Sequence, residues 1–364
     1  MSLSLGGSTS RGSSSRAPLV VGVDIGGTKT AILICEADGS VRGRHVAPTA
    51  VGAPDRAADA IDALVRVALA ESGASVADVA AVGVGVPGRV DPERGHITLA
   101  VNLDWHDLPL GPRLESRLGV MVVLENDVRA AALGLHRRRV FGDTATLALL
   151  AVGTGISAGV VIDGVLHRGA DGLAGEIGHV VMERDGPACP CGMRGCFEAI
   201  ASGPAIVRRV AEGWAAAGHS GAPAPAGAGI HPLGAEAVFA AAAAGDRVAI
   251  EVVEDAGRAV AWGVHLLALA YDVERIVLGG GVSHAGEPFM APIRRELDRF
   301  RDASPLAREV LVPGLVELLP PGADAGAWGA VTVAREALAA EVHELDAGSG
   351  RVAPDALGRE VGHA

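Results

Sequence analysis

The sequence predicts an α/β protein built as a duplicated fold, with two lobes and a central cleft between them. Its 364 residues are more than one hydrophobic core usually holds. An apolar strand, a turn that contains Gly and Thr, and a second strand occur twice, over residues 19–35 and 146–162. A second turn follows each copy, at residues 37–40 and 163–164. This repeated order of strands and turns predicts two related lobes.

The first lobe is expected to combine a sheet with helices that cover it. Apolar runs predict strands over Leu19–Ile25 and over residues 30–35, 41–46 and 79–86, the first three as a meander. Apolar residues at helical spacing predict a helix over residues 54–72. A strand that begins at Met121 runs into an alanine-rich helix near Asn126 and Asp127, two good N-cap residues. These two side chains should therefore lie at a strand-to-helix junction.

The second lobe is expected to follow the same plan. Strands are predicted over residues 146–152, 156–162, 165–166 and 275–278, and helices over residues 203–218 and 246–272. Residues 221–231 are rich in Pro, Gly and Ala, which predicts a loop. The strand at 275–278 meets three glycines, which permit the backbone to approach a ligand. A last helix, over residues 324–340, is expected to pack back across the first lobe.

Charge and cysteine usage limit the classes of protein to consider. The formal net charge is −12, which argues against a general nucleic-acid binder, because phosphate contacts need a basic field. The longest apolar stretch, residues 147–162, contains glycines and is too short to span a bilayer, and the Ser/Gly-rich residues 1–17 fit neither a secretory signal nor an anchor. Three of the four cysteines lie in one motif and Cys35 lies in an apolar strand. This pattern predicts free thiols in a reducing cytoplasm.

Residues 175–198 predict a metal site next to a ligand site. Four potential metal ligands lie between two glutamates: His179, Cys189, Cys191 and Cys196, between Glu176 and Glu198. One imidazole and three thiolates complete a tetrahedral Zn²⁺ site without a position for water, so the metal should be structural. Glu176 and His179 share a face of a helical turn, and a ring that gives one nitrogen to zinc can hydrogen-bond a ligand through the other. Folding on zinc would bring both glutamates to one pocket.

Lysine usage draws attention to one glycine turn. Of the 31 basic residues, 30 are arginine, and the single lysine, Lys29, directly follows Gly26, Gly27 and Thr28. A compact ammonium fits beside phosphates where a broad guanidinium does not, which favours a phosphate-binding turn. The alternative is a lysine that survives by chance on a surface turn.

The order of these motifs resembles a known superfamily. Asp24 precedes the Gly-Gly-Thr-Lys turn, and Glu-Asn-Asp at 125–127, Gly-Thr-Gly at 153–155 and the glycines at 279–281 follow. This order resembles the two phosphate loops and the adenosine loop of the superfamily that includes sugar kinases, actin and the large heat-shock chaperones, whose fold is ribonuclease-H-like. Within it, residues from about 19 to 340 resemble the ROK family (repressor, open reading frame, kinase), and most of all its zinc-containing bacterial glucokinases.

The resemblance implies a role for each matching residue. Asp127 would be the general base that accepts the proton of the sugar 6-hydroxyl during attack on the γ-phosphate of ATP. The sugar would be bound by Asn126, Glu176, His179 and Glu198, with Gly88 and Asn102 in sugar-facing loops. Asp24 would hold Mg²⁺, the phosphates would lie on Gly26, Gly27, Thr28, Lys29, Gly153, Thr154 and Gly155, and Gly280 and Gly281 would pass under adenosine. The implied cofactors are ATP, Mg²⁺ and structural Zn²⁺.

The predicted organisation and partners follow from the same pattern. Residues 18–128 with about 323–340 would form a small lobe, and residues 129–322 a large lobe that carries the zinc loop. Residues 1–17 are expected to be a disordered tail and residues 341–364 a polar tail. The expected partner is glucose or a similar hexose, with no nucleic acid or membrane, and the resemblance implies a homodimer or homotetramer.

Two departures from the family pattern keep the substrate open. Arg129 replaces the small or amide residue usual at its position, and Met193 stands where asparagine is common in the zinc segment. Neither removes a proposed ligand or base, but Arg129 could alter which sugar is accepted. Mannose, fructose or an N-acetylated hexosamine could replace glucose, and polyphosphate could replace ATP. A sugar-responsive repressor of this family carries an N-terminal winged helix-turn-helix, which residues 1–17 are too short to form.

Overall fold

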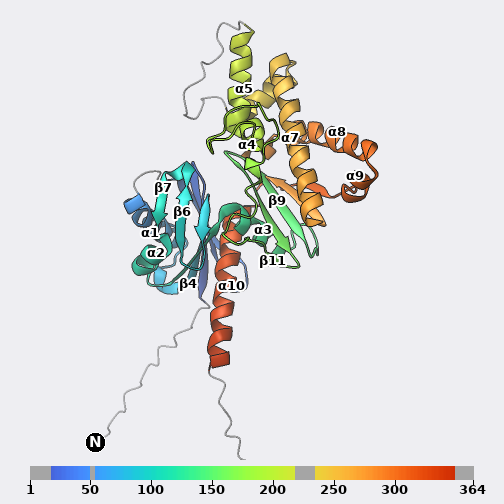
Figure 1. Cartoon of the computed structure of the whole chain (residues 1–364). Coiled ribbons are helices and arrows are strands. Elements are labelled where there is room, and N and C mark those ends of the chain that lie inside the picture. Colours follow the sequence, from blue (N-terminus) through green and yellow to red (C-terminus); the bar gives the residue numbers. More distant parts are fainter. Residues whose placement is uncertain (1–17, 50–53, 218–233, 349–364) are drawn as a thin grey trace, which may run out of the picture.

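The structure, a computed structural model, describes residues 18–49, 54–217 and 234–348 and is organised around two five-stranded sheets (Figure 1). The first sheet has the order β3-β2-β1-β4-β8. Its strands are β1 (Leu19–Ile25), β2 (Lys29–Cys35), β3 (Val41–Pro48), β4 (Val79–Val86) and β8 (Met121–Asn126). The second sheet has the order β11-β10-β9-β12-β13. Its strands are β9 (Leu147–Val152), β10 (Ile156–Ile162), β11 (Val165–Leu166), β12 (Arg275–Gly279) and β13 (Val316–Leu318).

The two sheets have the same topology, which confirms the duplication that the sequence predicts. In the first, β1 pairs antiparallel with β2 and parallel with β4; in the second, β9 pairs antiparallel with β10 and parallel with β12. The strands on either side also correspond, since β3 and β11 extend the hairpins and β8 and β13 lie at the parallel ends. Each Gly-Thr turn therefore joins the first two strands of its sheet.

Both faces of each sheet are covered, which explains the nearly continuous apolar runs of the central strands. Alternate residues of a strand point to opposite faces. On β9, Leu147 and Leu149 belong to the core cluster under α3 (Asp127–Arg137), while Ala148 and Leu150 belong to the cluster under α7 (Arg247–Tyr271). The central strands therefore sit in two-sided cores.

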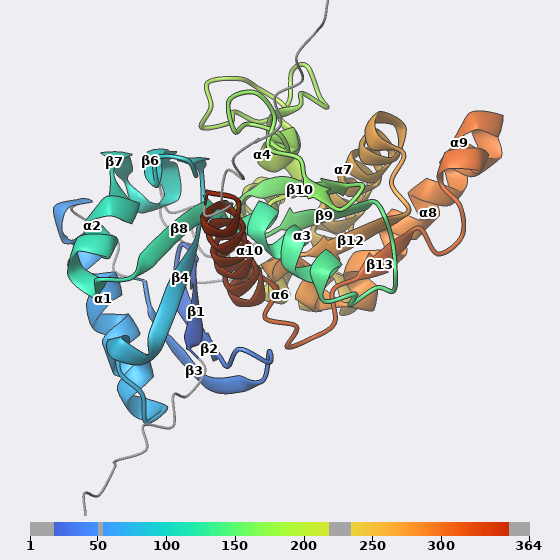
Figure 2. The same cartoon turned by 90° about the horizontal axis from the view of Figure 1, so that it is seen from below.

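The remaining elements cover the outer faces and edges. In the first lobe these are α1 (Pro54–Glu71), α2 (Leu110–Leu118) and a small sheet of β5 (Arg89–Asp91), β6 (His96–Ala100) and β7 (Trp105–Leu108), with the short 3₁₀ turns η1 (Val76–Asp78) and η2 (Val101–Leu103). In the second they are α4 (Phe197–Ala201), α5 (Gly203–Ala216), α6 (Ala235–Ala243), α8 (Glu287–Ala303) and α9 (Pro305–Val310), with η3 (Ile177–His179) and η4 (Gly281–Ala285). In both views α7 and α8 lie on the side of the second sheet away from α10 (Figures 1 and 2).

Helices α3 and α10 (Ala325–Gly348) lie side by side between the two sheets (Figures 1 and 2). They approach so closely that a β-carbon added to Gly134 on α3 would lie 2.8 Å from the α-carbon of Gly329 on α10. Each helix also meets one sheet through glycines. A β-carbon on Gly159 of β10 would lie 2.6 Å from the Val128 carbonyl oxygen of α3, and one on Gly83 of β4 would overlap the backbone of α10. Glycine at these positions therefore permits the backbone contacts that join the lobes.

Most of the predicted elements are present, with boundaries within two residues. The strands at residues 79–86, 156–162 and 165–166 have the predicted bounds, and α3 begins at Asp127 with Asn126 as its N-cap. The last helix packs against β1 and β4, as expected, but continues past Ala340 to Gly348, into the segment expected to be a polar tail. The predicted loop at 221–231 and the tail at 1–17 lie outside the described residues, and the division into lobes by residue number stays a prediction. Within the described ranges, no helix is long and apolar enough to cross a membrane.

Candidate functional site

The junction between β8 and α3 positions Asn126 and Asp127. Asn126 is the N-cap of α3, because its Oδ1 accepts a hydrogen bond from the Arg129 amide at 3.1 Å. Its Nδ2 donates to the Gly88 carbonyl at 3.1 Å, which ties the junction to the loop after β4. Asp127 is half-buried at the first position of the helix, where its Oδ1 accepts the Val128 amide at 2.9 Å. Asn126, not Asp127, is therefore the N-cap of α3. The Asp127 carboxylate is not used as the cap and can still accept a proton.

Asp24, at the end of β1, lies close to Asp127. The two residues are on either side of Gly85, whose added β-carbon would be 3.5 Å from the Asp127 α-carbon and 3.7 Å from an Asp24 carboxylate oxygen. The Asp24 carboxylate also meets the first turn of α10, where a β-carbon on Gly326 would overlap it. Glycines at 85 and 326 therefore leave space for two carboxylates between the lobes.

Burial dominates the electrostatics of these acids. It raises the pKa of Asp24 to about 7 and that of Asp127 to about 6, because an ionised carboxylate loses hydration there. The charge of Asp127 further raises the pKa of Asp24, whereas Lys29 lowers it. Glu176 raises the pKa of Asp127 and Arg129 lowers it. These acids therefore form one coupled set.

The first glycine turn is braced by Thr49. The Gly26 amide donates to the Lys29 carbonyl at 2.9 Å, and the Thr49 hydroxyl donates to the Gly26 carbonyl at 2.7 Å. Thr28 and Lys29 are exposed at the start of β2, and an added β-carbon on Gly27 would meet nothing within 4 Å. This open turn can accept an anion next to Asp24.

The second glycine turn carries a carboxylate against its backbone. Glu198 Oε2 accepts the Ile156 amide at 2.9 Å, and a β-carbon on Gly155 would lie 2.7 Å from the same oxygen. Burial raises the pKa of Glu176, which the charge of Glu198 also raises, so the two glutamates lie within electrostatic reach of each other. Thr154 is exposed at the tip of this turn.

The glycine run after β12 lies beside the second turn. A β-carbon on Gly153 would be 3.5 Å from the Gly281 amide nitrogen, and Gly280 has a φ of 87°. A side chain on Gly280 would overlap the Val152 carbonyl. The run therefore passes close to the turn at 153–155, and Gly281 is left exposed.

The structure gathers the predicted metal ligands into one cluster. The ligand atoms of His179, Cys189, Cys191 and Cys196 all lie within 4.8 Å of one another. His179 Nδ1 is 3.7 Å from Cys189 Sγ, and Cys191 Sγ is 3.6 Å from Cys196 Sγ. Ligands around a tetrahedral zinc with bonds of about 2.0–2.3 Å lie about 3.6–3.8 Å apart. The donor set and its spacing thus fit a closed Zn²⁺ site.

His179 connects the metal cluster to Glu176. Its Nδ1 faces Cys189, and its Nε2 lies 4.0 Å from Glu176 Oε2. The predicted helical turn is present as η3, with Glu176 as its N-cap residue. One imidazole can therefore bind zinc through Nδ1 and a polar ligand through Nε2.

Gly88 and Asn102 lie near each other in the first lobe. Gly88 has a φ of 95°, and an added β-carbon would overlap the backbone at Leu99 and Ala100. Asn102 follows in η2 with an exposed side chain. The hydrogen bond from Asn126 joins Gly88 to the site, whereas Asn102 is placed only by its nearness to that loop.

A buried charge cluster behind Asn126 has no role in the sequence-based prediction. Glu125, 0% exposed, accepts Arg129 Nε at 2.9 Å and Arg168 Nε at 2.6 Å. Its Oε1 also accepts the Asn126 amide at 2.8 Å. Glu125 belongs to the Glu-Asn-Asp motif, so its position was visible in the sequence. Of its partners, Arg129 is a neighbour on α3, whereas Arg168 comes from a distant loop.

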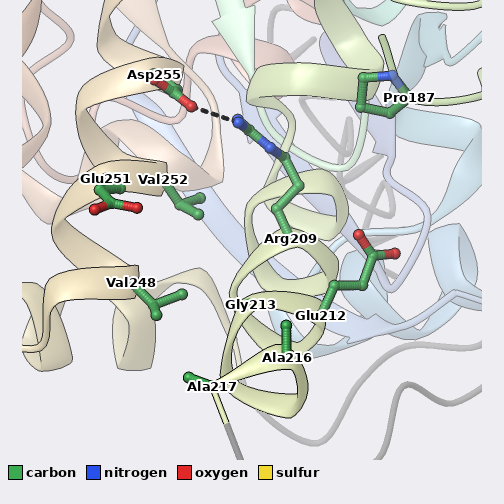
Figure 3. Close-up of a pocket in the computed structure, with 10 residues that line it drawn as sticks. All are labelled: Pro187, Arg209, Glu212, Gly213, Ala216, Ala217, Val248, Glu251, Val252 and Asp255. Carbon is green, nitrogen blue, oxygen red and sulfur yellow. Dashed lines mark hydrogen bonds and ion pairs between the residues drawn. The ribbon is translucent and has the colours of Figure 1, made fainter.

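A groove on the surface lies away from these residues. It has a volume of about 600 Å³ and lies between α5 and α7, next to Pro187 of the zinc loop (Figure 3). Across it, Arg209 pairs with Asp255 at 2.6 Å, as the figure shows. None of the predicted site residues lines this groove.

Known proteins resemble the chain over most of its length. Residues 20–337 match the ROK family. The chain is 36% identical over 323 residues to a glucokinase of Thermotoga maritima, covering 87% of this chain and 97% of that one. A glucokinase of Streptomyces coelicolor is 35% identical over 324 residues, covering 87% and 98%. A ROK family glucokinase from Streptomyces griseus, solved in complex with glucose and AMPPNP, is 34% identical with a TM-score of 0.71, covering 87% and 99%.

The cysteine cluster predicts bound zinc in the purified protein. Protein prepared without chelators should contain about one zinc per chain, and Cys191→Ser should lose it and melt at a lower temperature, because a structural site contributes directly to folding. Metal analysis and thermal melts measure both. Cys35→Ala, which removes a thiol far from the cluster in sequence, should keep its zinc. Zinc-free wild-type protein would contradict the assignment.

The raised pKa of Asp24 predicts a stability that depends on pH. The folded-state pKa of about 7 lies above the ordinary 3.8, so ionisation costs stability as the pH rises from about 4 through 7. Asp24→Asn should therefore stabilise the zinc-loaded protein in Mg²⁺-free buffer by on the order of 1–3 kcal/mol at pH 8 and have little effect near pH 4. Denaturant unfolding at both pH values measures this. The exposed Asp143→Asn is the control, and a gain independent of pH would contradict the electrostatic cause.

Proposed function

Because the chain belongs to the ROK family, we propose that it is a glucokinase, which transfers the γ-phosphoryl group of ATP to the 6-hydroxyl of glucose. One observation supports this most directly: Asp24, Asp127 and the two glycine turns lie near Glu176 and Glu198, the glutamates of the predicted zinc segment (residues 175–198). Similarity to glucokinases extends over 87% of the chain and nearly the whole of those relatives. A phosphotransferase with an alcohol acceptor is therefore the activity that fold and site support best.

Asp127 is proposed as the general base. As the glucose O6 attacks the γ-phosphorus, its proton passes to the Asp127 carboxylate, the O6–P bond forms, and the bond from that phosphorus to the β,γ-bridging oxygen breaks to release ADP. A loose transition state asks mainly for positioning and charge stabilisation, which a carboxylate fixed at the start of α3 supplies. With a pKa of about 6, Asp127 is ionised at neutral pH yet basic enough to accept the proton.

The sugar would be held from both lobes. Asn126 and the Gly88 loop would bind it from the first lobe, and Glu176, His179 and Glu198 from the second. Carboxylates can grip neighbouring hydroxyls through two hydrogen bonds, and the fixed orientation of His179 leaves Nε2 for the ligand. Because buried polar groups are costly when left unpaired, such a pocket selects sugars by their hydroxyls. Asn102 would contribute at its edge.

ATP would lie on the glycine turns and Mg²⁺ near Asp24. The open turn at Gly26–Lys29 and the turn at Gly153–Gly155 would bind phosphates through backbone amides, and Gly280 and Gly281 would pass under adenosine. Paired carboxylates with raised pKa values fit a cation that has oxygen ligands, so Asp24 would hold Mg²⁺. When bound, Mg²⁺ neutralises charge on the phosphates.

Zinc is proposed to be structural, and the thiols that bind it suit a reducing cytoplasm. A closed set of four protein ligands leaves no position for an activated water. The metal would instead fix His179, the last residue of η3. Because Glu176 precedes this short turn, the metal would fix Glu176 as well. The homodimer or homotetramer implied by the family stays a prediction.

Asp127→Asn should separate chemistry from binding. The variant keeps a side chain of the same shape but cannot accept a proton, so kcat should fall by roughly 10²–10⁴ while glucose binding changes far less. Steady-state kinetics and calorimetric titration of glucose measure the two effects. The matched control is Asp143→Asn, an exposed residue. Turnover within a few-fold of wild type would remove Asp127 from the role of base.

A panel of sugars and phosphate donors tests whether the enzyme prefers glucose and ATP. Glucose should be preferred in kcat/KM over 2-deoxyglucose, mannose, fructose and N-acetylated hexosamines, and Glu198→Gln should narrow the preference, because it removes a charged hydrogen-bond acceptor. ADP release with ATP or polyphosphate as donor, and NMR assignment of the phosphorylated position, measure this. Equal use of another sugar would reject the preference for glucose, and equal use of polyphosphate would reject specificity for ATP. Either result would still be consistent with a ROK sugar kinase.

A further inference from the structure

Arg129 is a buried cation in the centre of the molecule to which the proposed mechanism gives no role. It is 2% exposed, on the first turn of α3 and two residues after Asp127. Among the described residues its Nη2 is buried without a hydrogen-bond partner. Because the side chain is so fully buried, it does not contact a diffusing substrate in this conformation. A buried charge costs stability unless other groups pair with it. The side chain must therefore act through the groups it touches.

The contacts of Arg129 join three segments of the chain. Its Nε binds the Glu125 carboxylate at the end of β8, and its Nη1 donates to the Gly172 carbonyl at 2.6 Å. Glu125 in turn binds Arg168 at 2.6 Å, from the same segment as Gly172. That segment, residues 168–175, runs directly into Glu176. One carboxylate and two guanidinium groups thus hold the segment against the β8–α3 junction.

A further contact between the same segments lies outside the buried cluster. Arg89 on β5 donates from Nε to the Asp171 carbonyl at 3.3 Å. Gly172 also lies close to the first lobe, since an added β-carbon would be 3.1 Å from the Val90 carbonyl oxygen. The loop before Glu176 is therefore held from β5, β8 and α3. Of the three arginines that hold it, Arg129 is the buried one.

The charge of Arg129 also acts on Asp127. It lowers the pKa of Asp127, opposing the effect of burial. Other charged groups surround Asp127 and its neighbours from several elements: Asp24 on β1, Lys29 on β2, Glu125 on β8, Arg168 after β11, Glu176 and His179 at η3, Glu198 on α4 and Asp324 before α10. Within this group, Arg129 is the buried cation whose charge favours the ionised form of Asp127.

We propose that Arg129 is a positioning residue, which clamps residues 168–175 onto the β8–α3 junction and so sets both the placement of Glu176 and the charge environment of Asp127. This inference rests on the proposed function for its kinetic consequences but on the contacts alone for the clamp. A guanidinium is needed because it binds Glu125 and Gly172 through two separate nitrogens in a fixed geometry, which a lysine ammonium cannot reproduce. An amide would supply neither the charge nor the reach.

Two substitutions separate the clamp from the charge. Arg129→Lys keeps a cation but loses the two guanidinium nitrogens that bind Glu125 and Gly172. Residues 168–175 should therefore exchange amide hydrogens at least about tenfold faster. KM for glucose should rise about tenfold, with kcat changed little. Arg129→Gln loses both, so the acidic limb of kcat/KM should also move to higher pH, because removal of the cation raises the pKa of Asp127. The limb of Arg129→Lys should stay at the wild-type position.

The control is Arg137→Gln on the same helix. It removes the same charge from a side chain that is 42% exposed and paired with Glu336, and it should leave loop exchange, KM and the pH limb unchanged. Arg129→Lys keeps the buried charge balance, so it tests the clamp even if Arg129→Gln does not fold. Thermal melts confirm that each variant is folded.

The outcomes distinguish this proposal from the proposed function. Hydrogen exchange is measured without substrate, so a wild type that phosphorylates no sugar would reject the kinase while leaving the clamp testable. Unchanged exchange of residues 168–175 in both variants would overturn the clamp. An acidic limb that moves equally in Arg129→Lys and Arg129→Gln would overturn the role of the charge, because only one of these variants removes it.

Discussion

The close crossing of α3 and α10 is the constraint on which the rest of the structure depends. Their backbones meet at Gly134 and Gly329, and each helix rests on one of the two sheets through further glycines. The N-terminus of α3 carries Asp127, and the first turn of α10 meets Asp24 at Gly326. A side chain at the crossing would separate the helices and shift the second sheet relative to the first. The crossing thus sets how the second sheet faces the two acids, whose own spacing follows from the pairing of β1 and β8 with β4.

The elements that the sequence predicted well are those whose signals are local. Buried central strands read as apolar runs, and the turns at residues 26–28 and 153–155 mark hairpins that both sheets contain. The small sheet β5–β7 and helix α8 were not predicted. The strands of that sheet are short and half polar, and α8 is rich in arginine and acids and contains Pro292 inside the helix. Their structure depends on neighbours that lie far away in sequence.

In the candidate site, too, the sequence predicted the contacts between near neighbours in the chain and missed those between distant segments. The four predicted zinc ligands lie within a short segment, so ligand type and spacing predicted their cluster. The nearness of Glu176 to His179 likewise follows from one helical turn. Glu125 and Arg129 are neighbours on β8 and α3, but Arg168 and Gly172 reach them only through the tertiary fold. The sequence could therefore mark Arg129 as unusual without indicating that it is buried against Glu125.

The site also explains why this arrangement of charges is tolerated. Asp24 and Asp127 are held close together with pKa values of about 7 and 6, so at neutral pH each gives up stability that a neutral residue would keep. The charge of Lys29, which lowers the pKa of Asp24, and that of Arg129, which lowers the pKa of Asp127, offset only part of this cost. A cation bound near Asp24 and a proton transferred to Asp127 would each relieve it further. Under the proposed function, the carboxylates that weaken the fold would in turn favour cation binding and the proton transfer that phosphoryl transfer requires.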